Sequence, residues 1–302
     1  MKSVMRIALI GAALTTLALA LISSARAGGS DDPQLAGAES FAFGIGNGML
    51  SGNSDALARR LGDYDVVVVD GEEASPRDVS ALQDEGATVL AYLSVGTIEK
   101  WRGWYSDVKR YRLAAWQDWK DEWFADVSKR GLRDALAEEI APDILEKGFD
   151  GLFLDNVDMM EPNRYKKQRA GMRDLVAQLG GLVHADGGLL FAQNGYWGLR
   201  KFGILKDGHL DGWNREDVTW TYDFDRREYV RNSSRDRDEA LDDLAAMRDR
   251  GLFTMATNYT KRSTGAAVQE SIDDACAVGA LPFIGDIGLT AKRLPRSPYV
   301  CS

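Results

Sequence analysis

Eight short apolar segments alternate with helical patterns along this chain, and this alternation restricts the fold more than any other feature. Each segment is rich in β-branched or aromatic residues and is bounded by turn-forming residues, as the strands of a parallel sheet are. Eight alternating β and α units predict a (β/α)8 barrel, and a doubly wound open sheet is the alternative. The expected strands are 41–45, 65–70, 88–94, 151–155, 189–194, 211–216, 253–258 and 280–286.

Spacing, caps and stops mark the helices between these strands. Ser75-Pro76 is an N-cap and first-turn pair. Gly86, Gly148 and Gly251 each precede an expected strand, and glycine at such a position can end the helix before it. The expected helices are 54–61, 76–85, 131–147, 166–180 and 236–250.

The N-terminus has the pattern of an export signal. Lys2 and Arg6 precede the apolar run 7–22, and Ala25-Arg26-Ala27 fits a cleavage site. We therefore expect residues 1–27 to be a signal peptide that directs the protein to the periplasm or out of the cell; a retained membrane anchor is the alternative. Residues 28–37 are expected to be a flexible tail, and 38–302 a single domain without a stable membrane anchor.

The charge balance restricts the partners. Cleavage after Ala27 would remove three basic residues and no acidic one, which changes the formal net charge from −9 to −12. An acidic surface argues against nucleic acid, whose binding depends on neutralising phosphates, and would attract a cationic polymer. We expect the protein to be a monomer.

Cysteine and histidine contribute little chemistry. Cys276 and Cys301 either form a disulfide, as an exported chain allows, or remain two free thiols. His184 and His209 belong to no metal-binding motif and to no evident catalytic triad. Carboxylates are therefore the expected catalytic groups.

Polar side chains follow most of the expected strands. In a barrel, the carboxyl ends of the strands meet on one face and build the site. Asp155 ends a buried strand in this way, although a lone Asp there can also be a helix cap or a turn residue. The polar residues at or just beyond the strand ends are Asp70, Ser94, Asp155, Asp158, Asn194, Glu216, Asn258 and Asp286.

Tryptophans concentrate after the third expected strand. Five of them, at positions 101, 104, 116, 119 and 123, occupy one long segment that a barrel would place near its site. They form either a carbohydrate-binding platform or ordinary core packing. Trp101 and Trp197 are the candidates for stacking on sugar rings.

Three segments resemble glycoside hydrolase family 114, the endo-α-1,4-polygalactosaminidase-like TIM barrels. They are 64–70 (YDVVVVD), 91–99 (AYLSVGTIE) and 148–158 (GFDGLFLDNVD). The resemblance implies cleavage of α-1,4-linked galactosamine-containing polysaccharide without a metal or organic cofactor. It also implies a catalytic pair, Asp155 and Glu216, with Asp217 as the rival of Glu216.

The same resemblance implies that Asp70, Tyr92, Ser94, Asn194, Tyr222 and Asp286 line the sugar-binding cleft. We add Glu99, Trp101, Asp158 and Trp197 as substrate-binding candidates, because surplus carboxylates can bind sugar amines and indoles can stack on sugars. The alternative for the surplus carboxylates Asp70, Glu99, Asp158 and Asp286 is that they bind backbone amides, arginines or sugar hydroxyls.

The expected mechanism divides two roles between two carboxylates. Asp155 would act as nucleophile or electrostatic stabiliser and Glu216 as acid/base, or the reverse. The alternatives are a non-catalytic carbohydrate-binding barrel, a glycosidase for another amino-sugar polymer, and a divalent-metal enzyme built on Asp70, Asp155 and Asp158.

Overall fold

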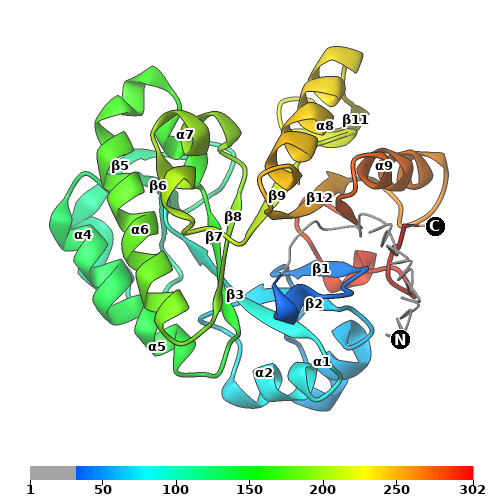
Figure 1. The fold of residues 1–302 in the computed structure, drawn as a ribbon, viewed down its shortest axis with the longest axis horizontal. Helices are drawn as coiled ribbons and strands as arrows, with labels where there is room; N and C mark the ends of the chain where they lie inside the picture. Colours follow the sequence, from blue (N-terminus) through cyan, green and yellow to red (C-terminus); the bar gives the residue numbers. More distant parts are fainter. Residues whose placement is uncertain (1–31, 302) are drawn as a thin grey trace, which may run out of the picture.

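Within residues 32–301, which the computed structural model describes, eight parallel strands form one sheet that curves into a nearly closed barrel (Figure 1). The rings of Phe41 and Phe283, on the first and last strands of the sheet, lie 5.5 Å apart and bring its two edges together. The predicted (β/α)8 barrel and its eight strands are confirmed. In sheet order, the strands are β1 (Phe41–Gly44), β2 (Val66–Asp70), β3 (Thr88–Ser94), β7 (Gly151–Asp155), β8 (Leu189–Gln193), β9 (Gly212–Glu216), β12 (Phe253–Tyr259) and β13 (Leu281–Gly285).

The strands are apolar on both faces because helices cover the outside and side chains fill the inside. All four consecutive valines of β2, Val66 to Val69, are fully buried, as a parallel strand between two packed layers requires. Aromatic pairs occupy the interior, with ring centroids 5.1 Å apart for Phe43 and Phe153 and 5.9 Å apart for Phe191 and Phe253.

The helices around the barrel follow the expected pattern with three differences. The predicted Ser75 cap is present as a capping box, with Asp78 as its partner. The predicted helix 131–147 is divided, because a π-helical segment, Ala135–Ile140, joins α4 to α5 just before Pro142. The helices are α1 (Ser54–Leu61), α2 (Pro76–Gln83), α3 (Tyr105–Val108), α4 (Arg130–Asp134), α5 (Ala141–Leu145), α6 (Arg169–Ala185), α7 (Tyr196–Lys201), α8 (Ser234–Arg248) and α9 (Ala266–Ala277).

The other two differences concern α6 and three helices that were not expected. The predicted end of the fourth helix at Gly180 is wrong, because α6 continues through this residue. A Cβ at Gly180 would lie 2.9 Å from the Cβ of His209, so the glycine allows close packing and does not stop the helix. The helices α3, α7 and α9 were absent from the sequence-based expectation.

Two insertions extend the barrel beyond the carboxyl ends of its strands. The segment after β3 forms an antiparallel sheet of β4 (Thr97–Glu99), β6 (Glu122–Ala125) and β5 (Arg112–Ala115). The segment after β9 forms a hairpin of β10 (Trp220–Asp223) and β11 (Glu228–Arg231). The rings of Trp119 and Phe224 lie 5.7 Å apart and join the two insertions.

A disulfide links Cys276, near the end of α9, to Cys301. The alternative of two free thiols is therefore wrong. The bond ties the C-terminal segment to the last helix and encloses a loop with a sequence separation of 25.

The predicted signal peptide, residues 1–27, lies outside the described residues, as does the start of the predicted tail. From Pro33 to Leu35 the chain forms a 3-10 turn, with Leu35 buried and the Gln34 side chain donating to the carbonyl of Gly187. Among residues 32–301, no helix has the length and apolar character needed to cross a bilayer.

Candidate active site

A cavity of about 430 Å³ opens at the carboxyl ends of the barrel strands. Its walls come from seven of the eight strands and from both insertions, so residues far apart in the sequence share one space. Of the residues predicted for the site, eight line this cavity: Asp70, Tyr92, Glu99, Trp101, Asp155, Asp158, Asn194 and Glu216.

Asp155, the last residue of β7, is held by hydrogen bonds on both carboxylate oxygens. The Tyr92 hydroxyl donates to Oδ2 at 2.6 Å, and the Gln193 side-chain amide donates to Oδ1 at 2.9 Å. Asn156 adds its backbone N–H to Oδ1 at 2.7 Å and its side-chain amide to Oδ2 at 3.1 Å. Burial raises the pKa of Asp155, and these donors oppose the rise because they stabilise the ionised form.

Glu216, the last residue of β9, has fewer donors. The Asn194 side-chain amide donates to Oε2 at 2.8 Å, and the Tyr259 hydroxyl donates to Oε1. Burial raises the pKa of Glu216 to about 8, and the negative charges of Asp155 and Asp217 contribute to the rise. At neutral pH Glu216 therefore favours the protonated form.

A chain of side-chain hydrogen bonds runs from Asp155 through Gln193 across the neighbouring strands. The Asn214 amide donates to Oε1 of Gln193 at 2.8 Å, and the Thr257 hydroxyl donates to Oδ1 of Asn214 at 3.1 Å. Because the oxygen of Gln193 faces Asn214, its nitrogen must face Asp155. One strand, β8, separates β7 from β9 in the sheet, so the backbones that carry Asp155 and Glu216 lie roughly 10 Å apart.

A buried arginine neutralises two of the predicted substrate-binding carboxylates. Arg102 is 5% exposed and pairs with Asp70 at 2.7 Å, with Glu99, and with Glu72 at 3.6 Å. Burial raises the pKa of Glu99 to about 7, and the Arg102 charge opposes the rise. Asp70 and Glu99 are therefore partners of a protein cation, which is the arginine alternative that the sequence left open for these carboxylates.

Other carboxylates in the cavity have no such arginine. Glu122 forms no ion pair with any described residue, and burial raises its pKa to about 8. Burial also raises the pKa of Asp158 to about 7. Asp217, the rival of Glu216, lines the cavity, and its buried Oδ1 has no hydrogen-bond partner within residues 32–301.

The five clustered tryptophans divide between the cavity and the packing around it. Trp101, Trp116 and Trp119 line the cavity, and Trp101 is 53% exposed. Trp104 and Trp123 pack instead against other parts of the first insertion, where arginine guanidinium groups lie over their rings. The segment therefore supplies both a wall of the cavity and its support.

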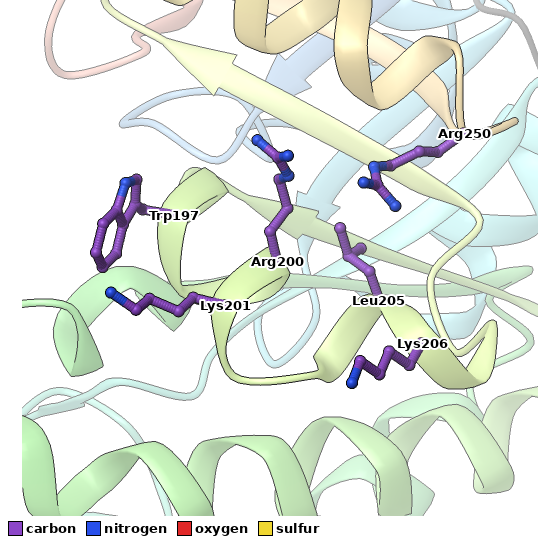
Figure 2. Close-up of a pocket in the computed structure, with 6 residues that line it drawn as sticks. All are labelled: Trp197, Arg200, Lys201, Leu205, Lys206 and Arg250. Atoms are coloured by element: carbon purple, nitrogen blue, oxygen red, sulfur yellow. The ribbon is translucent and has the colours of Figure 1, made fainter.

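Four predicted residues do not line the cavity. Ser94 is buried behind it and contacts Thr97 at 2.6 Å. Tyr222 packs on Phe224 and Tyr229, Asp286 binds Thr290, and Trp197 lines a separate pocket (Figure 2).

The residues that sequence reasoning missed include Arg102, Glu122, Gln193 and Tyr259. Gln193 and Tyr259 end strands β8 and β12, so their position at a strand end was a usable signal. Arg102 and Glu122 lie on the first insertion, whose folding no local pattern indicated.

The donor set does not favour a metal centre. Within residues 32–301, no three His, Cys, Asp or Glu side chains are grouped as a metal ion requires. Asp70, one of the three residues of the divalent-metal alternative, is bound to Arg102. The geometry instead presents two buried carboxylates with different numbers of hydrogen-bond donors in one cavity.

Comparison with known proteins identifies relatives of this arrangement. The sequence model of the Glycoside-hydrolase family GH114 matches residues 28–202. The search of curated proteins returned no match.

Solved structures with the same fold include three glycoside hydrolases. The glycoside hydrolase domain of PelA from Pseudomonas aeruginosa is 25% identical with a TM-score of 0.69, over 84% of this chain and 96% of that one. Aspergillus fumigatus Ega3, solved as a complex with galactosamine, is 15% identical with a TM-score of 0.64, over 92% and 98%. The α-galactosidase TtGalA from Thermus thermophilus is 12% identical with a TM-score of 0.53, over 81% and 57%.

Proposed function

The chain belongs to the glycoside-hydrolase family GH114 and is a glycosidase, and from this premise we propose that it cleaves α-1,4-linked galactosamine-containing polysaccharide with Asp155 and Glu216 as the catalytic pair. The observation that carries the proposal is the contrast between these two buried carboxylates in one cavity. Asp155 accepts four hydrogen bonds, whereas Glu216 has fewer donors and a pKa raised to about 8.

This contrast suits the two roles that glycoside cleavage needs. Glu216, protonated at neutral pH, gives its proton to the oxygen of the leaving sugar as the glycosidic bond breaks. Asp155, whose donors favour its ionised form, faces the positive charge that develops at the anomeric carbon and either stabilises it or attacks it. The negative charge of Asp155 contributes to the raised pKa of Glu216, so simultaneous ionisation of both groups is disfavoured.

An amino-sugar substrate fits the charge of the cavity. Glu122, Asp158 and Asp217 line it without a buried arginine partner of the kind that Asp70 and Glu99 have. Burial raises the pKa of Glu122 to about 8 and that of Asp158 to about 7, and a bound ammonium group would favour their ionised forms. It would then give these carboxylates charge-assisted hydrogen bonds, which are stronger than those of a hydroxyl. Ega3, which shares the fold, was solved with galactosamine bound. Trp101 and Trp119 supply aromatic faces at the mouth of the same cavity.

The substrate is tested with three polymers of matched length: α-1,4-galactosaminan with free amines, the same polymer fully N-acetylated, and neutral α-1,4-galactan. We expect mass spectrometry to detect shorter oligosaccharides from the free-amine polymer and few from the neutral one. Equal cleavage of the free-amine and neutral polymers would contradict the recognition of amines by the cavity. It would not contradict the assignment of the protein as a glycosidase.

A further inference from the structure

A second pocket, of about 440 Å³, lies on the outer wall of the barrel and shares no residue with the catalytic cavity (Figure 2). It is formed by α7, by the 3-10 turn Ile204–Asp207 and by the residues just after α8. Among the lining residues whose side chains the structure describes, four are cations and none is an acid. These lining residues are Trp197, Arg200, Lys201, Leu205, Lys206 and Arg250.

Among the side chains that the structure describes, none of these four cations forms an ion pair. Burial raises the pKa of Asp243, on α8, to about 7, and the nearby charge of Arg200 opposes the rise, so this acid balances part of the Arg200 charge. Arg200 is held by the Tyr196 hydroxyl, and the Lys201 ammonium lies 3.8 Å from the centre of the Trp197 ring. Figure 2 shows Arg250 reaching from beyond α8 toward Leu205 and Arg200. Like charges held together raise the free energy of the empty pocket, and a bound anion would lower it.

Aromatic and apolar groups accompany the charges. Trp197 is 56% exposed, and Leu205 adds an apolar surface to the same pocket. An indole can stack on the C–H face of a sugar ring, and guanidinium groups bind carboxylates through two parallel hydrogen bonds. The volume lies within the range of small-ligand pockets, about 300–1,000 Å³.

The acidic character of the whole chain favours a ligand with separated anionic groups over a densely charged polyanion. The whole chain has a formal net charge of −9, so a nucleic acid extending from the pocket would meet a repulsive surface. A glycan with carboxylates on separate sugar rings would meet less repulsion and could use Trp197. We propose that this pocket binds a carboxylate-bearing sugar residue, of the uronate type, within a polysaccharide. This function is separate from catalysis in the acidic cavity.

Isothermal titration calorimetry on the protein tests the proposal with a short oligogalacturonate, a neutral galactose oligosaccharide of the same length, and inorganic phosphate. We expect the oligogalacturonate to bind and the neutral sugar not to bind. The Kd of the oligogalacturonate should rise at least about tenfold when the NaCl concentration increases from about 50 mM to about 500 mM. Equal binding of the two oligosaccharides would overturn the role of the charges, and absence of binding by the oligogalacturonate would overturn the site.

Variants locate the site and identify the ligand class. Arg200→Gln with Arg250→Gln should weaken oligogalacturonate binding at least about tenfold. The control pair, Arg77→Gln with Arg235→Gln, makes the same charge change at exposed positions and should leave the Kd unchanged. Equal effects of the two pairs would place binding elsewhere.

Trp197→Ala should weaken the binding of the oligogalacturonate but not the binding of phosphate. The sugar assignment would be overturned if phosphate bound as tightly as the oligogalacturonate and Trp197→Ala changed neither affinity. Thermal midpoints verify folding of each variant.

Discussion

The side-chain amide of Gln193 donates a hydrogen bond of 2.9 Å to the carboxylate of Asp155, one strand away. Asn214 fixes the direction of this bond, because it donates to the oxygen of Gln193 from the next strand. The ionised form of Asp155 is therefore stabilised by residues of three neighbouring strands and not by its own motif alone.

Gln193→Met should remove this donor at nearly constant volume. We expect kcat to fall by about tenfold, since a hydrogen bond to a charged group contributes roughly 1.5–3 kcal/mol. Loss of the donor should raise the pKa of Asp155, so the acidic limb of the kcat/KM profile should move to higher pH. A pH–rate profile measures both effects, and an unmoved acidic limb would show that Gln193 does not act on Asp155.

Asp155→Asn and Glu216→Gln should each lower hydrolysis of a galactosamine polymer by at least about a thousandfold. Each change removes a carboxylate and keeps the side-chain size. Asp225→Asn, at an exposed position outside the cavity, is the control and should keep full activity. Asp217→Asn distinguishes Glu216 from Asp217 as the second catalytic carboxylate. If Asp217→Asn abolishes turnover while Glu216→Gln does not, Asp217 is the partner of Asp155.

Tyr259→Phe and Tyr92→Phe form a matched pair that assigns the two roles. The Tyr259 hydroxyl bonds Glu216 and lowers its pKa, so its loss should raise that pKa and move the basic limb of the pH–rate profile upward. The Tyr92 hydroxyl bonds Asp155, so its loss should move the acidic limb upward. If each variant moves the opposite limb, the acid and the nucleophile are reversed.

Arg102→Met should destabilise the protein by about 3–5 kcal/mol, because it leaves the buried carboxylates of Asp70 and Glu99 without a cation. Urea denaturation measures the change in the free energy of unfolding. The matched control is Lys100→Met, which breaks a solvent-exposed pair with Asp121 and should have little effect. Similar losses in both variants would mean that Arg102 contributes no more than a surface ion pair.

Cys276→Ser with Cys301→Ser should destabilise the fold by about 3 kcal/mol, the loop-entropy contribution expected for a sequence separation of 25. Activity at room temperature should not change, because neither cysteine lines the cavity. Differential scanning calorimetry should show a lower Tm, and a reductant should lower the Tm of the natural protein only. A reductant effect of equal size on the double variant would exclude the disulfide as its cause.

The sequence by itself determined the barrel and the place of its principal carboxylates. The period of apolar residues and the turn residues around them are local properties, so the eight strands and the position of Asp155 at the end of β7 could be predicted. The family resemblance, combined with the position after the sixth expected strand, led to Glu216 at the end of β9. The segment after β3 was recognised as long and rich in tryptophan, but not as a three-stranded sheet.

Only the tertiary structure decided which side chains meet. Trp197 and Tyr222 follow strand ends as closely as cavity residues do, yet the turns after β8 and β9 direct them elsewhere. Arg102 reaches Asp70 across 32 positions, and the Gln193 amide takes its direction from another strand. Such contacts depend on the packing of distant segments, and burial sets the pKa of Glu216 only after that packing has excluded water.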